Sequence, residues 1–195
     1  MDWFISDTHF GHKKIIEYTN RPFSSVDEMD ENIIQRWNYR VGKDDTVFHL
    51  GDFCLGGEKE AHRYFIQLNG KITVLANPWH HDKNWLKRGV EYKSYKGHPV
   101  EIVDAIHVLE YPQFAISTYP RAVVLSHYPQ LVWERKHFLS WHMYGHIHNL
   151  NAPYFSEGVL ALNVCVDATN FRPVSIEEVS FHMLLTEAQL GLKPV

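Results

Sequence analysis

Short apolar runs alternate with amphipathic segments along the first half of this 195-residue chain. The runs are residues 3–5, 46–50 and 71–76. They are rich in β-branched and aromatic residues, which favour strands, and the amphipathic segments between them have the apolar spacing of helices. The predicted helices cover 13–18, 25–40 and 58–68. Ser25 with Glu28 three residues later is the pattern of a capping box, so the second helix is predicted to begin there.

The second half of the chain has a different pattern, made mainly of strands. The strand-like segments are 100–103, 106–109, 114–117, 122–126 and a later one at 159–166. The first two are predicted to form a hairpin around Asp104-Ala105, and the last forty residues give only weak helical signals, at Glu177-Glu178 and at 186–190. Strand–helix alternation followed by further strands predicts an α/β fold with a second sheet packed against the first. No repeat or linker divides the chain, so a single domain over 1–195 is expected.

Polar residues with metal-ligand chemistry follow the apolar runs, each near the point where a run ends. They are Asp7, His9, Asp52, Asn77, His127, His146 and His148. Parallel strands end at the same edge of a sheet, so these residues are expected to converge there. In Asp7-x-His9, and again in His146-x-His148, alternate residues of an extended segment would face the same side. Two carboxylates, an amide oxygen and four imidazoles are a ligand set for two divalent cations, and Asp52 is suited to bridge them.

Composition narrows the choice of partner and compartment. The chain has 14 histidines and two cysteines, and neutral imidazole is a common metal ligand near pH 7. Its formal charge of −4 argues against a basic surface for nucleic acid, so a nucleic acid partner is not favoured. Cys54 and Cys165 form no disulfide framework, which fits buried thiols in the cytoplasm. The N-terminus lacks the pattern of a signal peptide, and no apolar run is long enough to span a membrane.

The ordered set of motifs resembles the calcineurin-like metallophosphoesterase family. The resemblance runs from Ile5 to about Pro173 and rests on Asp-x-His, Gly-Asp, Asn, His and Gly-His-x-His. The stretch Ile5-Ser6-Asp7-Thr8-His9-Phe10-Gly11-His12 and the stretch Asn20-Arg21-Pro22-Phe23 are similar to a small branch found in bacteria and their phages. So are Asn163-Val164-Cys165-Val166-Asp167 and Arg172-Pro173-Val174-Ser175. The resemblance implies a two-sheet α/β/β/α sandwich of the metallo-dependent phosphatase type.

The resemblance also implies an activity and a division of the ligands. The activity is hydrolysis of a phosphodiester or phosphomonoester by a hydroxide bound between two metal ions. The first ion would be held by Asp7, His9, Asp52 and His148. The second would be held by Asp52, Asn77, His127 and His146, with Asp52 bridging. This mixed set of ligands suits Mn, Fe, Ni, Co or Zn and does not distinguish among them. The expected substrate is a small phosphate ester, and nucleotides are among the candidates.

One motif departs from the family pattern. The family has Gly-Asn-His-Asp, in which the histidine protonates the leaving oxygen, whereas this chain has Ala76-Asn77-Pro78-Trp79-His80-His81-Asp82. If 78–80 is an insertion, His81 is the general acid and Asp82 orients its ring; His80 is the rival candidate. Loss of a general acid costs about two to four orders of magnitude in rate. The departure therefore keeps open a metal-binding scaffold that acts in protein interaction, and a nuclease is a further alternative.

Several other residues are predicted to lie near the ligands without being ligands. Arg21 and Arg172 are candidates for contact with a substrate phosphate, because a guanidinium matches phosphate geometry. The alternative for each is an ion pair or a loop anchor. Asp167 is expected either in a turn or as a hydrogen-bond partner of the ligand histidines. His12 lies either near the site or at a helix start, and His49 is expected in the core.

Overall fold

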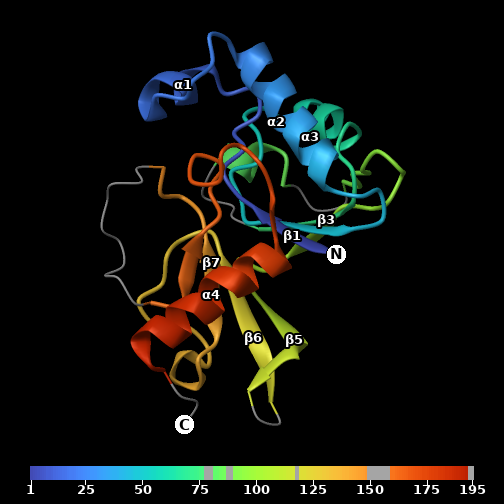
Figure 1. Ribbon diagram of the computed structural model, residues 1–195. Helices are drawn as coiled ribbons and strands as arrows, with labels where there is room; N and C mark the ends of the chain where they lie inside the picture. The colour runs from blue at the N-terminus through green and yellow to red at the C-terminus, as the bar shows by residue number, and fades with distance from the viewer. Residues whose placement is uncertain (77–80, 87–89, 117–118, 149–158, 193–195) are drawn as a thin grey trace.

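The first sheet is built mainly by the first half of the chain, with one further strand from near its C-terminal end (Figure 1). In this computed structural model, which describes residues 1–76, 81–86, 90–116, 119–148 and 159–192, the strand order is β4-β3-β2-β1-β9. The strands are β1 (Asp2–Ile5), β2 (Thr46–His49), β3 (Lys71–Leu75), β4 (Glu101–Val103) and β9 (Val174–Ser175). The first four are parallel, and β9 is antiparallel to β1. All three strands predicted in the first half are confirmed.

The helices predicted between these strands are also confirmed. They are α1 (Lys13–Thr19), α2 (Val26–Arg40) and α3 (Glu58–Phe65), with a short 3-10 helix η1 (His81–Asn84) after β3. The hydroxyl of Ser25 caps α2 by accepting a hydrogen bond from the Glu28 amide. The Glu28 carboxylate accepts from the amide and hydroxyl of Ser24 instead of the Ser25 amide. The predicted helix start is therefore correct, although its acidic side chain reaches one residue further back than a capping box requires.

The second sheet has the order β5-β6-β7-β8. Its strands are β5 (Ile106–Ile116), β6 (Tyr119–Ser126), β7 (Trp141–Tyr144) and β8 (Ala161–Asn163), and a 3-10 helix η2 (Lys136–Phe138) precedes β7. The strands β5 and β6 are antiparallel, whereas β6, β7 and β8 are parallel. The predicted hairpin around Asp104-Ala105 is wrong, because β4 pairs with β3 and the chain crosses to the other sheet at these two residues. Alternating polarity marks both segments as strands but carries no information about which distant strand each one joins.

The C-terminal helix α4 (Ile176–Leu190) is longer than its weak sequence signals indicated. It begins with a complete capping box, in which the Ser175 hydroxyl accepts from the Glu178 amide and the Glu178 carboxylate accepts from the Ser175 amide. This is the Ser-x-x-Glu spacing that also marks the start of α2. The rest of the helix lacks a polar face, because Phe181 and Leu185 are exposed on its outer side. Without an amphipathic period the sequence pattern does not stand out.

Two hydrophobic cores bury both faces of the first sheet. In β1, Trp3 and Ile5 belong to the core beneath α1, α2 and α3, whereas Phe4 belongs to the core that contains the second sheet and α4. The molecule is thus a mixed α/β protein with two mixed sheets flanked by helices (Figure 1). Burial on both faces explains why the parallel strands are continuous apolar runs. Among the described helices, none is long and apolar enough to cross a membrane.

Candidate metal centre

Six of the seven predicted ligands converge where the two sheets meet. Asp7 and His9 follow β1, Asp52 follows β2, His127 follows β6, and His146 and His148 follow β7. The seventh, Asn77, lies outside the described residues. The loops are joined beyond the strand ends, since the Asp7 amide donates to the Gly51 carbonyl and the His9 amide donates to the Asp52 carbonyl, each at 3.0 Å. Parallel strand ends therefore assemble the site, as the sequence predicted.

Four of these ligands have a left-handed backbone conformation. The φ angles are 59° at Asp7, 51° at His9, 55° at Asp52 and 68° at His146. The expectation that Asp7 and His9 share a face of an extended segment is wrong, because β1 ends at Ile5 and both residues lie in a tight loop. Positive φ is uncommon for residues other than glycine and collects at functional sites, where the surrounding structure holds the strained conformation.

The Asp52 carboxylate lies between two groups of ligand atoms. Its Oδ2 atom is 3.5 Å from His9 Nε2 on one side and 3.7 Å from His127 Nε2 on the other. On the His127 side, His127 Nε2 is 3.2 Å from His146 Nδ1. On the His9 side, His148 Nε2 is 3.7 Å from Asp7 Oδ1. A cation about 2.1 Å from each ligand atom fits between atoms that are about 3–4 Å apart.

Unsatisfied polar atoms in this region fit a cation. Asp7 Oδ1 and His9 Nε2 are both buried without a hydrogen-bond partner. Buried polar atoms are normally paired, so two unpaired ligand atoms that face a common centre are costly unless a cation binds them. Ligand atoms of Asp7, His9 and Asp52 lie within 4.8 Å of one another, and so do those of Asp52, His127 and His146. The residues present therefore fit two divalent cations that share Asp52.

The pKa shifts in the site follow from burial. Burial, and to a smaller extent the nearby carboxylates of Asp7 and Asp82, together raise the pKa of Asp52 to about 8. Burial also lowers the pKa of His9 and of His146, which keeps both imidazoles neutral and able to bind a metal ion. A bound cation would favour the charged form of Asp52 and so oppose the effect of its burial.

The second ring nitrogen of three ligand histidines has a partner of its own. His148 Nδ1 donates to the Asp167 carboxylate at 2.7 Å, and His127 Nδ1 lies 3.2 Å from the carbonyl oxygen of Leu50. His9 Nδ1 lies 3.3 Å from His12 Nδ1. Such partners fix the ring orientation and leave the Nε2 atom for a metal ion. The sequence left open whether His12 lies near the site or at a helix start, and both descriptions are correct, because His12 is the N-cap of α1 and the partner of His9.

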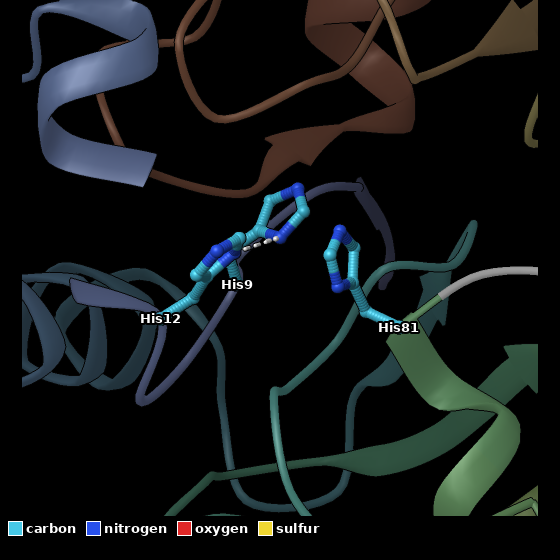
Figure 2. A group of neighbouring side chains, drawn as sticks. All are labelled: His9, His12 and His81. Atoms are coloured by element: carbon cyan, nitrogen blue, oxygen red, sulfur yellow. Dashed lines mark hydrogen bonds between the residues drawn. The ribbon is translucent and has the colours of Figure 1, made fainter. Parts of the chain in front are cut away.

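His81 faces this cluster from η1 (Figure 2). Its ring centroid lies 4.9 Å from that of His9 and 4.8 Å from that of His12. The imidazole is only partly buried, and this burial lowers its pKa. The other candidate for the general acid, His80, lies outside the described residues. The structure therefore brings one of the two predicted histidines to the ligands.

Asp82 has a different place from the one expected. Its carboxylate is fully buried and accepts hydrogen bonds from the amides of Phe53 and Cys54 and from Trp85 Nε1. It thus anchors η1 to the loop that carries Asp52. The predicted role was to orient the His81 ring, and the carboxylate instead binds these three groups. Side chains of adjacent residues in a 3-10 helix point in different directions, so His81 faces the site while Asp82 faces the core.

Both candidate arginines form ion pairs within the protein. Arg21 is 4% exposed and pairs with Asp167, and Arg172 pairs with Glu178 at 2.9 Å. The alternative expectation of a protein ion pair is therefore correct for both. His49 is fully buried, as expected, and its ring lies 3.1 Å from the Thr8 hydroxyl and accepts from the Gly51 amide. His49 thereby connects the loops that hold Asp7 and Asp52.

Similar proteins are known from archaea, bacteria and phages. No family model matches the chain. The crystal structure of a protein of unknown function from Aquifex aeolicus, AQ665, has the same fold, with a TM-score of 0.66 at 24% identity, covering 93% of this chain and 98% of that one. The gene 66 protein of Mycobacterium phage L5 is 32% identical over 142 residues, which are 65% of this chain and 62% of that protein.

An archaeal relative covers more of the chain. The uncharacterized protein MJ1445 of Methanocaldococcus jannaschii is 33% identical over 178 residues, and the match covers 90% of this chain and 86% of that protein. Identity at this level over nearly the whole of both chains shows common descent, so the present chain belongs to the family of MJ1445.

Proposed function

We propose that this protein is a metal-dependent phosphoesterase that uses two divalent cations to hydrolyse a phosphodiester or phosphomonoester. The observation that carries the proposal is the position of Asp52, whose Oδ2 atom lies 3.5 Å from His9 Nε2 and 3.7 Å from His127 Nε2. One carboxylate between two sets of imidazoles is the arrangement that two cations sharing a ligand require. Two such cations, when bound, activate a water molecule for attack on phosphorus and neutralise charge on the phosphoryl oxygens.

The ligands divide between the two cations by proximity. Asp7, His9 and His148 lie on one side of Asp52, and His127 and His146 lie on the other. In this proposal Asn77 completes the second group, as the calcineurin-like resemblance implies. The two mixed sheets with outer helices are then the α/β/β/α sandwich of the metallo-dependent phosphatases.

His81 is the residue proposed to protonate the leaving oxygen. Its ring is next to His9 but belongs to none of the ligand groups around Asp52. Burial lowers its pKa, whereas the Asp7 carboxylate raises it, and the negative charge of a bound phosphate ester would favour the protonated ring further. A neutral imidazole in the free protein that gains a proton with the substrate is suited to general acid catalysis.

The substrate is expected to enter on the side of the histidines. His81, His146 and His148 are partly exposed, whereas Asp7, His9, Asp52 and His127 are buried. Tyr128 lies at the same side, with its ring 4.7 Å from that of His146, and is 42% exposed. The carboxylates therefore form the closed floor of the site, and imidazole rings surround its opening.

The test is metal analysis combined with turnover. The protein is reconstituted with Mn²⁺, bound metal is measured by elemental analysis, and hydrolysis of bis-p-nitrophenyl phosphate and p-nitrophenyl phosphate is followed. We expect about two ions per chain and metal-dependent turnover of at least one of the two esters. His127→Ala should lose metal and turnover, whereas His182→Ala, which removes an exposed histidine of α4, should keep both.

Two results would contradict the proposal. Absence of bound metal in the reconstituted protein would remove its basis. Two ions per chain without turnover of either ester would favour the scaffold alternative, in which the metals serve structure and protein interaction.

A further inference from the structure

A buried guanidinium lies behind the candidate metal centre. The Arg21 side chain is fully buried, in the segment between α1 and α2. Its NH2 group donates to the carbonyl oxygen of Asp7 at 2.9 Å, and its NH1 group donates to that of Thr8 at 3.1 Å. It therefore holds the backbone of the loop in which Asp7 and His9 have positive φ.

The same guanidinium binds a second loop through Asp167. Arg21 Nε and NH2 donate to the two carboxylate oxygens of Asp167, at 3.0 and 2.8 Å. Asp167 Oδ2 also accepts from His148 Nδ1 at 2.7 Å. His148 and Arg21 therefore both donate to the one Asp167 carboxylate.

These contacts connect ligands that come from different sheets. Asp7 follows β1 of the first sheet, and His148 follows β7 of the second. Arg21 and Asp167 join the two through a continuous series of hydrogen bonds. Every nitrogen of the Arg21 guanidinium already donates to the protein, which leaves none to bind a phosphate.

The partner of His148 differs in charge from those of His127 and His9. His148 Nδ1 binds a carboxylate, whereas His127 Nδ1 faces a peptide carbonyl and His9 Nδ1 faces the imidazole of His12. A carboxylate partner makes an imidazole more basic and fixes its tautomer, so it strengthens the bond to a metal ion. This carboxylate partner lies on the side of Asp52 that contains Asp7, His9 and His148.

We propose that Arg21 and Asp167 are a positioning pair for one of the two cations, and that they raise the affinity of that site selectively. The pair fixes the His148 ring against Asp7 and holds the strained Asp7-Thr8-His9 loop in place. The inference rests on the proposed binding of two cations but assigns these two residues a role that no ligand motif contains. It predicts that the two cation sites differ in affinity and that the site of His148 is the tighter one.

The test is the Mn²⁺ affinity of each site in the Asp167→Asn variant. Asparagine has the same size but lacks the negative charge, and its amide group would face the Arg21 donors. We expect two binding steps in the wild-type protein by titration calorimetry after chelation. In the variant one step should weaken by about 10- to 100-fold, as is typical when such a partner is lost. The other step should change less than about twofold.

Matched variants separate positioning from folding. Arg21→Lys keeps the charge but cannot hold Asp167 and both carbonyl oxygens together, so it should weaken the same step by about tenfold. Arg172→Ala removes a partly exposed ion pair in the nearby segment and should leave both steps unchanged. The melting temperature of each metal-free variant is compared with that of the wild type, since a purely structural role would lower this temperature without favouring one step.

The possible results separate this inference from the proposed function. If wild-type protein binds two Mn²⁺ ions and both steps are unchanged, or are weakened equally, in Asp167→Asn and Arg21→Lys, the positioning pair is wrong and the two-cation proposal stands. If wild-type protein binds no Mn²⁺, both proposals are wrong. If Asp167→Asn does not fold, Arg21→Lys alone decides by the same criterion.

Discussion

The first sheet supplies both carboxylates of the candidate centre, Asp7 and Asp52, whereas the second sheet supplies three imidazoles, at His127, His146 and His148. The two contributions also differ in exposure. Asp7 and Asp52 are 0% and 3% exposed, whereas His146 and His148 are partly open to solvent. A charged group is costly to bury unless it is paired, and burial raises the pKa of Asp52. The imidazoles of His146 and His148 lie on the more open side.

The seam between the two sheets is closely packed. The His146 amide, after β7 of the second sheet, donates to Asp7 Oδ2, after β1 of the first, at 2.9 Å. Ser6 pairs with Cys165 in a parallel bridge that continues beyond the strands. The comparison therefore teaches that the site depends on how accurately the two sheets, which share one core, are joined.

The largest effect is expected from Asp52→Asn, which removes the charge shared by both sides. The neutral amide cannot offset the positive charge of two cations. We therefore expect activity to fall about 10⁴-fold, which corresponds to an activation barrier higher by about 5 kcal/mol. Elemental analysis should show weakened binding of both ions. Asp104→Asn, at an exposed position between β4 and β5, is the control and should behave as wild type. Retention of both ions at full affinity in Asp52→Asn would show that Asp52 does not bridge.

A smaller effect is expected from His81→Ala, which removes the partly exposed imidazole of η1 that lies next to His9. We expect turnover to fall by about a hundredfold or more, because the leaving oxygen loses its proton donor. Metal content should stay at the wild-type level, since the groups that contain Asp52 do not include His81, whereas loss of metal would point to the group of His9, His12 and His81. His62→Ala, at an exposed position in α3, is the matched control. Unchanged turnover in His81→Ala would eliminate the general-acid assignment and direct attention to His80.

Gly145→Ala tests the seam itself. A Cβ atom on Gly145 would lie 2.2 Å from Ser6 Oγ and 2.4 Å from Asp7 Oδ2, which is too close for either atom. We expect the free energy of unfolding to fall by up to about 3 kcal/mol, together with loss of metal at the Asp7 side. At Gly57, where a Cβ would meet Glu60 Oε2 at 3.6 Å, the same substitution should leave metal binding intact. Equal metal binding in both variants would mean that the seam has room to adjust.

The smallest effect compares one buried histidine from each sheet. Burial lowers the pKa of His49, in β2, to about 3 and that of His142, in β7, to about 4, from an ordinary value of 6.5. Below pH 6.5 the unfolded chain takes up a proton at each histidine, whereas the folded protein does not until the pH nears the lowered values. Stability is therefore lost as the pH falls, by about 2 kcal/mol per histidine at pH 5.

Urea unfolding of the chelated protein at pH 7 and pH 5 measures this loss. The variants His49→Gln and His142→Gln should each remove about half of the contribution from the two histidines. If neither substitution reduces the difference between the two pH values, these histidines are not the cause. If only one substitution reduces this difference, the pKa of the buried histidine is lowered more in one sheet than in the other.

The sequence predicted local features well and tertiary pairing poorly. The strands and helices of the first half are confirmed, because their buried faces leave a clear periodic pattern. The hairpin at Asp104-Ala105 was wrong, since the strand partners of β4 and β5 are distant in the sequence. The helix α4 was underestimated, although Ser175 and Glu178 carry the same capping signal as Ser25 and Glu28.

The candidate site shows the same division. The residue types and their order at strand ends identified Asp7, His9, Asp52, His127, His146 and His148 as a group. The sequence could not show that Arg21 is buried behind them, that Asp82 is turned toward Trp85, or that His12 is the partner of His9. Each of these roles depends on contacts between loops whose course is not encoded by any local period.

By itself the sequence determined which side chains could bind cations and that strand ends would present them, because both follow from residue type and local periodicity. Only the tertiary structure decided the left-handed turns at Asp7 and His9, the place of Asp52 between two groups of histidines, and the contacts of Arg21 with both loops. The reason is physical. These features arise where the two sheets meet, and the free energy of that junction is spread over residues far apart in the chain.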